Sequence, residues 1–168
     1  MTTATEYVTN TDAAALAAWL RDARSVVCLT HVKPDGDALG STLAIARAIT
    51  LATRTSGAAC VAECWYAAPL PDWAPASIGN TKTRAIEPGQ PVPGALAPER
   101  IVITDTGAWN QLDGYADWLR ARADRAAVLD HHLSGDADTA PRRVVNTTHA
   151  AVCQSAAELC AAILGVRT

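Results

Sequence analysis

Short apolar runs alternate along the chain with longer stretches in which apolar residues recur every three or four positions. The run SVVCLT over residues 25–30 is rich in β-branched residues and is typical of a buried strand. Similar runs predict further strands over residues 58–65, 101–104, 126–129 and 143–145. The stretches between them predict helices over residues 11–23, 39–53, 114–123 and about 150–164.

The alternation of strands and helices indicates the fold class. We expect an α/β fold with a mainly parallel sheet that carries helices on both faces. In the first helix, Leu16, Trp19 and Leu20 fall on one face, and Asn10 or Thr11 can cap its start. Residues 67–98 hold seven of the nine prolines, so we expect a long surface excursion there rather than a core element.

Composition narrows the class of protein. With 168 residues, 49% of them hydrophobic and 18% charged, the chain suits one globular domain over residues 1–168. The net charge of −3 provides no positively charged surface of the kind that binds a long nucleic-acid duplex. No apolar run approaches the ~20 residues of a membrane span, and the first ten residues lack the pattern of a signal peptide. Five cysteines without a CxxC pair favour a reducing, cytoplasmic setting.

Polar residues of metal-binding type follow three of the predicted strands. They are His31, Asp35 and Asp37 after the first, Asp105 after the 101–104 strand, and Asp130, His131 and His132 after the 126–129 strand. Parallel strands bring their carboxyl ends to one edge of the sheet, where ligands of open α/β sheets bind. We therefore expect these side chains to converge at that edge.

The converging set contains more ligands than one metal ion needs. Five of its members supply three carboxylates, which attract hard divalent cations, and two imidazoles, which add affinity for Mn, Fe or Zn. These five are His31, Asp35, Asp37, Asp105 and His131. Gly36 could adopt a left-handed turn that lets the carboxylates of Asp35 and Asp37 diverge toward two ions. Each motif alone has an ordinary alternative: PDGD is a common turn, TDTG an ordinary loop, and paired histidines decorate many surfaces. Their joint occurrence after three apolar strands favours the metal site.

These motifs resemble a known family in order and placement. The segments HVKPDGDALGS, ITDTG and LDHH are similar to motifs I, II and III of the DHH phosphoesterase superfamily. They are most similar to its RecJ-like branch, which acts on nano-RNA and 3′-phosphoadenosine 5′-phosphate. The later QSAAEL, around Ser155 and Glu158, also matches that branch, so the resemblance spans roughly residues 25–164.

The resemblance implies a site for two divalent metal ions, most commonly Mn²⁺. By analogy, His31 and Asp35 hold one ion, Asp37 and His131 hold the other, and Asp105 bridges the two. The implied mechanism is two-metal hydrolysis, in which Asp105 belongs to the catalytic centre and no side chain is a covalent nucleophile.

The resemblance also implies roles for residues around the metals. His132 would be catalytic and face the substrate phosphate, and Asp130 would orient a histidine from behind. Ser41 and Thr42, after Gly40, are expected to open a helix whose amides help to bind the substrate anion. The alternative for Ser41 is that it only caps that helix.

The chain departs from the family in two respects. Full-length relatives carry a fourth-motif Asp at a further strand end and a C-terminal substrate-binding domain, and we find neither. Asp136 and Asp138 come too soon after the DHH motif and suit a polar loop. We therefore expect an incomplete second metal site, little activity, and a sheet with an unpaired edge that promotes self-association.

Three functions remain open from the sequence. The first is a metal-dependent phosphoesterase that hydrolyses short oligonucleotides or nucleotide 3′-phosphates, without long-duplex or membrane partners and with possible homo-oligomers. The second is an inorganic pyrophosphatase-like enzyme of the same superfamily, which the wording of PDGDALGS and QSAAEL disfavours. The third is a non-catalytic metal-binding or partner-binding remnant, and the intact set of five metal ligands argues against it.

Overall fold

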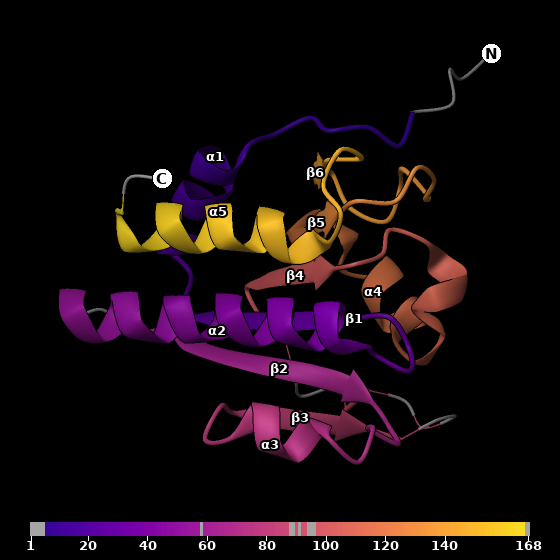
Figure 1. The fold of residues 1–168 in the computed structure, drawn as a ribbon, viewed down its shortest axis with the longest axis horizontal. Coiled ribbons are helices and arrows are strands. Elements are labelled where there is room, and N and C mark those ends of the chain that lie inside the picture. Colours follow the sequence, from indigo (N-terminus) through magenta and orange to yellow (C-terminus); the bar gives the residue numbers. More distant parts are fainter. Residues whose placement is uncertain (1–5, 58, 88–89, 91, 94–96, 167–168) are drawn as a thin grey trace.

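A six-stranded parallel sheet forms the centre of the computed structural model, which describes residues 6–57, 59–87, 90, 92–93 and 97–166 (Figure 1). Its strands are β1 (Ser25–Thr30), β2 (Val61–Ala67), β3 (Thr83–Ile86), β4 (Arg100–Thr104), β5 (Ala126–Asp130) and β6 (Arg142–Val145). They lie in the order β3-β2-β1-β4-β5-β6, and each neighbouring pair is parallel. The expected α/β class with a parallel sheet is confirmed, although residues 1–5, 58 and 167–168 of the expected domain and strands lie outside the described residues.

Helices cover both faces of the sheet, as the sequence predicts. The helices are α1 (Ala13–Arg21), α2 (Gly36–Ser56), α3 (Ala74–Ile78), α4 (Ala116–Arg120) and α5 (Val152–Leu164), with 3-10 turns η1 (Trp109–Gln111), η2 (Asp113–Tyr115) and η3 (Ala123–Arg125). Helices α1, α2 and α5 pack on one face, while α4 and its flanking turns pack on the other (Figure 1). The central strands are therefore buried on both sides, which explains their continuous apolar runs.

Strand β1 shows how side chains divide between the two layers. Val26 and Cys28 join the core beneath α1, α2 and α5, whereas Val27 and Leu29 join the core beneath α4. This alternation follows from the two-residue period of a strand. Because one short strand supplies both cores, its end is fixed in position from above and below.

Two expected segments differ from the structure. The 114–123 helix is broken into η2, the five-residue α4 and η3, because Gly114 favours helix poorly and Tyr115 and Leu119 are held by the core instead. Residues 67–98 are not only a surface excursion, since they include α3 and β3. Strand β3 lies at the sheet edge, where it pairs only with β2 and tolerates prolines on its flanks. Residues 88–89, 91 and 94–96 of this segment lie outside the described residues.

The outer edge of β6 is covered rather than unpaired, which corrects our expectation of an open edge. Residues 7–11 run alongside it before α1 begins at the Asp12 cap. The amide of Arg143 donates to Asn10 Oδ1 at 2.8 Å, and the Arg143 carbonyl accepts from the Asn10 amide at 2.9 Å. The Arg143 side chain is also buried, and its guanidinium donates to the carbonyls of Ala137 and Ala140. The contacts with Asn10 were not foreseen because they join residues that lie 133 positions apart in the sequence.

Within the described part of the chain, every helix is too short or too polar to cross a bilayer.

Candidate metal centre

The chain reverses its direction of travel across the sheet between β1 and β4. From β1 it builds β2 and β3 on one side, and then returns to place β4 on the other side of β1. The carboxyl ends of β1 and β4 flank this switch point, which is where open parallel sheets bind ligands. His31 directly follows β1, and Asp105 directly follows β4.

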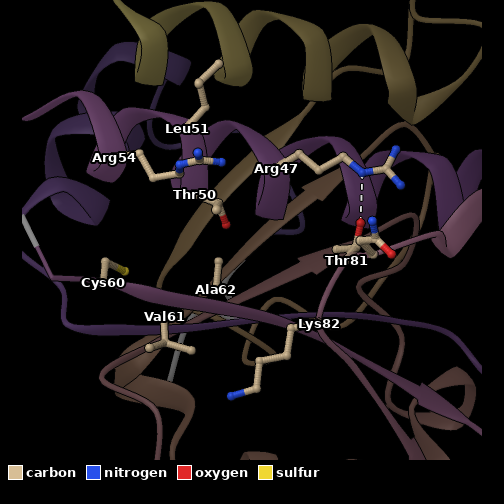
Figure 2. A pocket seen from close by; sticks show the side chains of 10 residues that line it. Arg47, Thr50, Leu51, Arg54, Cys60, Val61, Ala62, Thr81 and Lys82 are labelled. Carbon is tan, nitrogen blue, oxygen red and sulfur yellow. Dashed lines mark hydrogen bonds between the residues drawn. The ribbon is translucent and has the colours of Figure 1, made fainter.

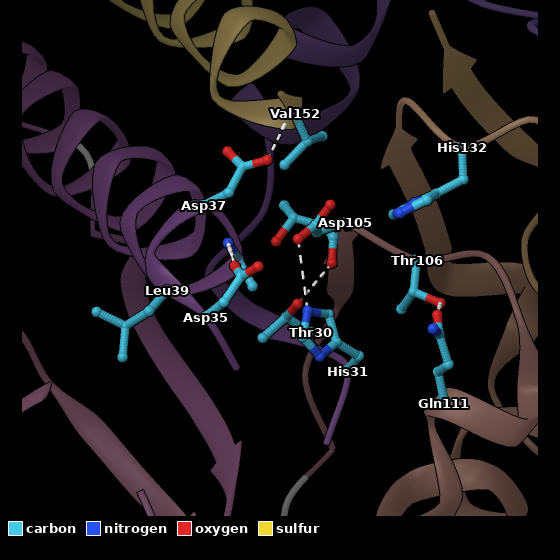
Figure 3. Close-up of polar contacts among 12 residues, drawn as sticks. Thr30, His31, Asp35, Asp37, Leu39, Asp105, Thr106, Gln111, His132 and Val152 are labelled. Atoms are coloured by element: carbon cyan, nitrogen blue, oxygen red, sulfur yellow. Dashed lines mark hydrogen bonds and ion pairs between the residues drawn. The ribbon is translucent and has the colours of Figure 1, made fainter. Parts of the chain in front are cut away.

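Asp105 occupies the middle of the candidate site. Its Oδ2 lies 3.4 Å from His31 Nε2 (Figure 3). Its Oδ1 lies 3.4 Å from His131 Nε2. The residue is buried, and within the described structure Oδ1 has no hydrogen-bond donor. Its backbone is left-handed, with φ of 63°, while its amide still donates to the Leu129 carbonyl at 2.9 Å. Such a conformation costs about 1–3 kcal/mol, so the surrounding structure holds this carboxylate in place against strain.

The two imidazoles beside Asp105 are oriented by backbone carbonyls. His31 Nδ1 lies 2.8 Å from the Val32 carbonyl, and His131 Nδ1 lies 3.2 Å from the His149 carbonyl. A proton on each Nδ1 leaves both Nε2 atoms free to accept a cation. The hydrogen bond that His31 donates to the carboxylate of Asp105 raises the pKa of His31 above its ordinary value, and burial opposes this shift.

Asp35 and Asp37 diverge because of where helix α2 begins. Asp35 is the N-cap, and its Oδ1 accepts from the Ala38 amide at 3.0 Å. Asp37 lies in the first turn of α2 and accepts the amides of Val152 and Cys153, at the start of α5, at 2.7 and 2.9 Å (Figure 3).

This helix start corrects our expectations for Gly36 and Ser41. Gly36 is the first residue of α2 and does not take the left-handed turn that we expected. Ser41 neither opens nor caps the helix, because α2 starts five residues earlier, at Gly36, with Asp35 as its N-cap. Its hydroxyl is buried inside α2 without a hydrogen-bond partner in the described structure, so the structure does not support a substrate contact there. Thr42 is likewise buried and hydrogen-bonds Tyr66.

Two groups of ligand atoms meet at Asp105. His31, Asp35 and Asp105 have ligand atoms within 4.8 Å of one another, and so do Asp105, His131 and His132. Asp37 lies slightly further out, with Oδ2 4.0 Å from His131 Nε2. A set of carboxylate oxygens and imidazole nitrogens suits a first-row divalent metal ion. Asp105 Oδ1, which receives no hydrogen bond within the described structure, is an acceptor that such a cation would satisfy. The residues present therefore fit two cations that share Asp105.

Asp130 and His132 form a separate pair beside these groups. Asp130 is fully buried, and its Oδ1 lies 2.7 Å from His132 Nδ1. The His132 side chain is 48% exposed, and its Nδ1 is the ring nitrogen that faces Asp130. The structure thus brings Asp130 behind His132, as the family resemblance implies for a carboxylate that orients a histidine.

Sequence reasoning missed four partners of this site. The His149 carbonyl, the amides of Val152 and Cys153, and the hydroxyl of Tyr7, which donates to Asp130, all support the site residues. Val152 and Cys153 directly precede the QSAAEL segment, which marks this part of the chain but does not reveal the role of the two amides. Backbone groups carry no sequence signature, and Tyr7 is 123 residues from Asp130, so neither could be found from spacing.

The polar loop after the DHH motif has a structural role, as expected. Asp136 accepts a hydrogen bond from the Trp109 amide at 2.8 Å, and Asp138 accepts one from the Trp109 indole N–H at 2.9 Å.

Away from the site, a groove of about 510 Å³ lies between α2 and the starts of β2 and β3 (Figure 2). There Arg47 donates to Thr81 at 2.8 Å, which ties α2 to the segment before β3. This groove is at the opposite end of the strands from Asp105 and belongs to the packing of the sheet edge.

Comparison with known proteins agrees with the geometry. The model of the DHH family, N-terminal domain, matches residues 25–167. A solved structure of an exopolyphosphatase-related protein from Bacteroides fragilis has a similar fold, with a TM-score of 0.65 at 17% sequence identity. The match covers 95% of this chain and 45% of that chain, so this chain spans less than half of that protein. No protein of curated function matches the sequence.

Proposed function

Because the chain belongs to the DHH family through its N-terminal domain, we propose that it is a metal-dependent phosphoester hydrolase. Its substrates are short oligonucleotides or nucleotide 3′-phosphates. The observation that carries the proposal is the buried carboxylate of Asp105 held between His31 and His131, with one oxygen toward each ring. A shared carboxylate of this kind suits two cations acting on one phosphate.

The proposed ligands follow from the two groups around Asp105. His31 and Asp35 would complete one cation site, and His131 and Asp37 would contribute to the other. The resemblance to the RecJ-like branch implies Mn²⁺ as the cation. Bound divalent cations supply Lewis-acid chemistry, since they polarise the phosphoryl group and activate water at neutral pH.

The protein side chains supply orientation and charge. Asp130 accepts from Nδ1 of His132, which leaves Nε2 on the opposite edge of the ring to face a phosphoryl oxygen. Asp37 is held by two amides of α5, so its carboxylate has little freedom to rotate. No side chain in this arrangement needs to form a covalent bond to the substrate.

The size and setting of the substrate follow from the rest of the molecule. A net charge of −3 opposes binding of a long duplex, which supports a small nucleotide as the substrate. All five cysteines are free, which supports a reducing cytoplasmic setting.

The test is a hydrolysis assay with Mn²⁺ at high enzyme concentration. The substrates are a ribodinucleotide, adenosine 3′,5′-bisphosphate, long duplex DNA and inorganic polyphosphate. We expect release of product from the first two only, and none from the Asp105→Asn variant. Failure to hydrolyse any substrate would refute the proposal. Hydrolysis of polyphosphate alone would favour the second candidate, a phosphoanhydride hydrolase, which the name of the Bacteroides fragilis protein suggests.

The His132→Ala variant tests the role of that residue in the same assay. We expect kcat to fall by more than Mn²⁺ affinity, because the proposed partner of His132 is the phosphate. His132 also belongs to one of the two groups of ligand atoms, so the alternative role for it is that of a metal ligand. An equal loss of Mn²⁺ affinity would make His132 a metal ligand instead.

A further inference from the structure

The segment before α1 delivers one side chain to the DHH motif. Residues 7–11 lie along β6, where Thr9 Oγ1 accepts the Val145 amide at 2.7 Å and donates to its carbonyl at 2.6 Å. Together with the contacts of Asn10 described above, these bonds fix the path of the segment. The path places Tyr7 over the carboxyl end of β5.

The ring of Tyr7 fills a slot between two glycines. A Cβ atom added to Gly107 would lie 2.0 Å from the Tyr7 hydroxyl, and one added to Gly135 would lie 2.6 Å from the ring. Neither distance is compatible with a side chain, so both positions require glycine while Tyr7 occupies the slot. Gly107 follows the β4 motif and Gly135 follows the DHH motif, so the slot is formed by the two loops that carry the site.

The hydroxyl of Tyr7 completes the hydrogen bonding of Asp130. It donates to Asp130 Oδ2 at 2.6 Å, whereas Oδ1 accepts from the His131 amide at 2.8 Å and pairs with His132 Nδ1 at 2.7 Å. Among the described residues, Tyr7 is the only hydrogen-bond partner of Oδ2. Burial and the negative charge of Asp130 raise the pKa of Tyr7 far above its ordinary value, so the hydroxyl stays protonated and acts as a donor.

We propose that Tyr7 is a positioning residue for phosphate hydrolysis, which acts by holding Asp130 so that His132 presents Nε2 to the substrate. The proposal rests on the proposed function for its catalytic consequence. The His132 ring is 48% exposed, and among the described residues its only side-chain hydrogen bond is to Asp130. Its orientation therefore depends on a single rotamer of that carboxylate.

Removing the hydroxyl would leave Oδ2 without a donor in a site that excludes water. The carboxylate of Asp130 would then be able to rotate toward the backbone amides of His131 and His132. Its hydrogen bond with the His132 ring would compete with these other orientations of the carboxylate. The metal ligand His131 is held independently by the His149 carbonyl. Loss of the Tyr7 hydroxyl should therefore change the orientation of the His132 ring without changing the affinity for cations.

The experiment compares Tyr7→Phe with wild type, and uses Tyr115→Phe as the matched control. Tyr115 is buried and, within the described structure, its hydroxyl has no hydrogen-bond partner, so its loss should change nothing at the site. For Tyr7→Phe we expect kcat to fall about 10-fold, as outer partners of metal-site residues typically show, with KM and Mn²⁺ affinity unchanged. Nitrogen NMR of the metal-free protein should show the His132 ring changing from one tautomer to a mixture, while His31 does not change.

Each outcome decides the proposal. An unchanged His132 tautomer in Tyr7→Phe would overturn it, and so would a matching loss of Mn²⁺ affinity, which would make Tyr7 merely structural. Because the NMR measurement needs neither metal nor substrate, it also separates this proposal from the function. Wild-type protein without hydrolytic activity would refute the function, while the tautomer comparison would still decide whether Tyr7 positions His132.

Discussion

At the scale of single residues, the site could be predicted where the sequence carries the ligand itself. His31, Asp35, Asp105 and His131 follow strand ends, and the structure brings all four together. Ser41 was misplaced because helix propensity does not mark the first turn, whereas the Asp35 side chain caps the helix and fixes its start. Backbone groups that orient ligands have no residue type, so sequence reasoning cannot find them.

The raised pKa of His31 predicts how metal binding depends on pH. A cation binds the neutral imidazole, so below the raised pKa it must displace a proton. Mn²⁺ affinity should therefore fall as the pH drops through a range that begins above the usual pKa of histidine, about 6.5. In the metal-free protein the sign is opposite: the His31–Asp105 pair stabilises the fold at acid pH, and this contribution is lost as the pH rises through the raised pKa.

Calorimetry in two buffers with different ionisation enthalpies measures this proton release. We expect wild-type protein to release a proton at neutral pH on binding Mn²⁺, and the His31→Gln control to release less. Mn²⁺ affinity that stays constant between pH 6 and pH 8 would contradict the assignment of His31 as a ligand.

At the scale of elements, the strands of the sheet centre were predictable and the edges were not. Residues 25–30, 101–104 and 126–129 are buried on both faces, so their apolar runs are continuous. Strand β3 is short, pairs on one side and lies within a proline-rich segment, so its pattern is weak. The register of the sheet is likewise set by contacts between distant segments, which periodicity does not reveal.

Helix α5 begins without a side-chain cap of its own, which predicts a structural role for Asp37. Its N-cap is Ala151, whose side chain cannot accept a hydrogen bond. Asp37 on α2 instead accepts hydrogen bonds from the first two amides of α5, which have no partner within that helix. We expect Asp37→Ala to lower the free energy of unfolding of metal-free protein by about 1 kcal/mol, as lost caps typically do. Urea unfolding measures this change. Asp37→Asn keeps one acceptor oxygen and should lose less, so equal stability of both variants and wild type would contradict this role.

At the scale of the whole molecule, the N-terminal segment closes the sheet and stands beside the site. Residues 7–11 cover the outer edge of β6, which the predicted strands alone leave without a partner. The fold of the domain could be predicted from the alternation of strands and helices, but this closure could not, because it joins segments that lie 133 residues apart in the sequence. An uncovered strand edge promotes self-association.

Asn10→Ala tests whether this closure keeps the molecule from associating. The change removes the acceptor for the Arg143 amide and the donor to the Pro141 carbonyl. We expect a loss of about 1 kcal/mol in stability and a shift toward oligomers in size-exclusion chromatography with light scattering. Asn10→Asp keeps the acceptor and serves as the control. A variant with the elution and stability of wild type would show that the edge needs no cover.

The central claim is that two cations share Asp105, and calorimetric titration of Mn²⁺ into metal-free protein tests it most directly. Asp105→Asn is the appropriate variant, because asparagine tolerates the left-handed backbone at φ of 63°. It removes the charge and replaces one of the two carboxylate oxygens with an NH₂ group, which cannot bind a cation. We predict two Mn²⁺ per chain for wild type and weakened binding at both sites in the variant. Unchanged affinity and stoichiometry in Asp105→Asn would contradict the account.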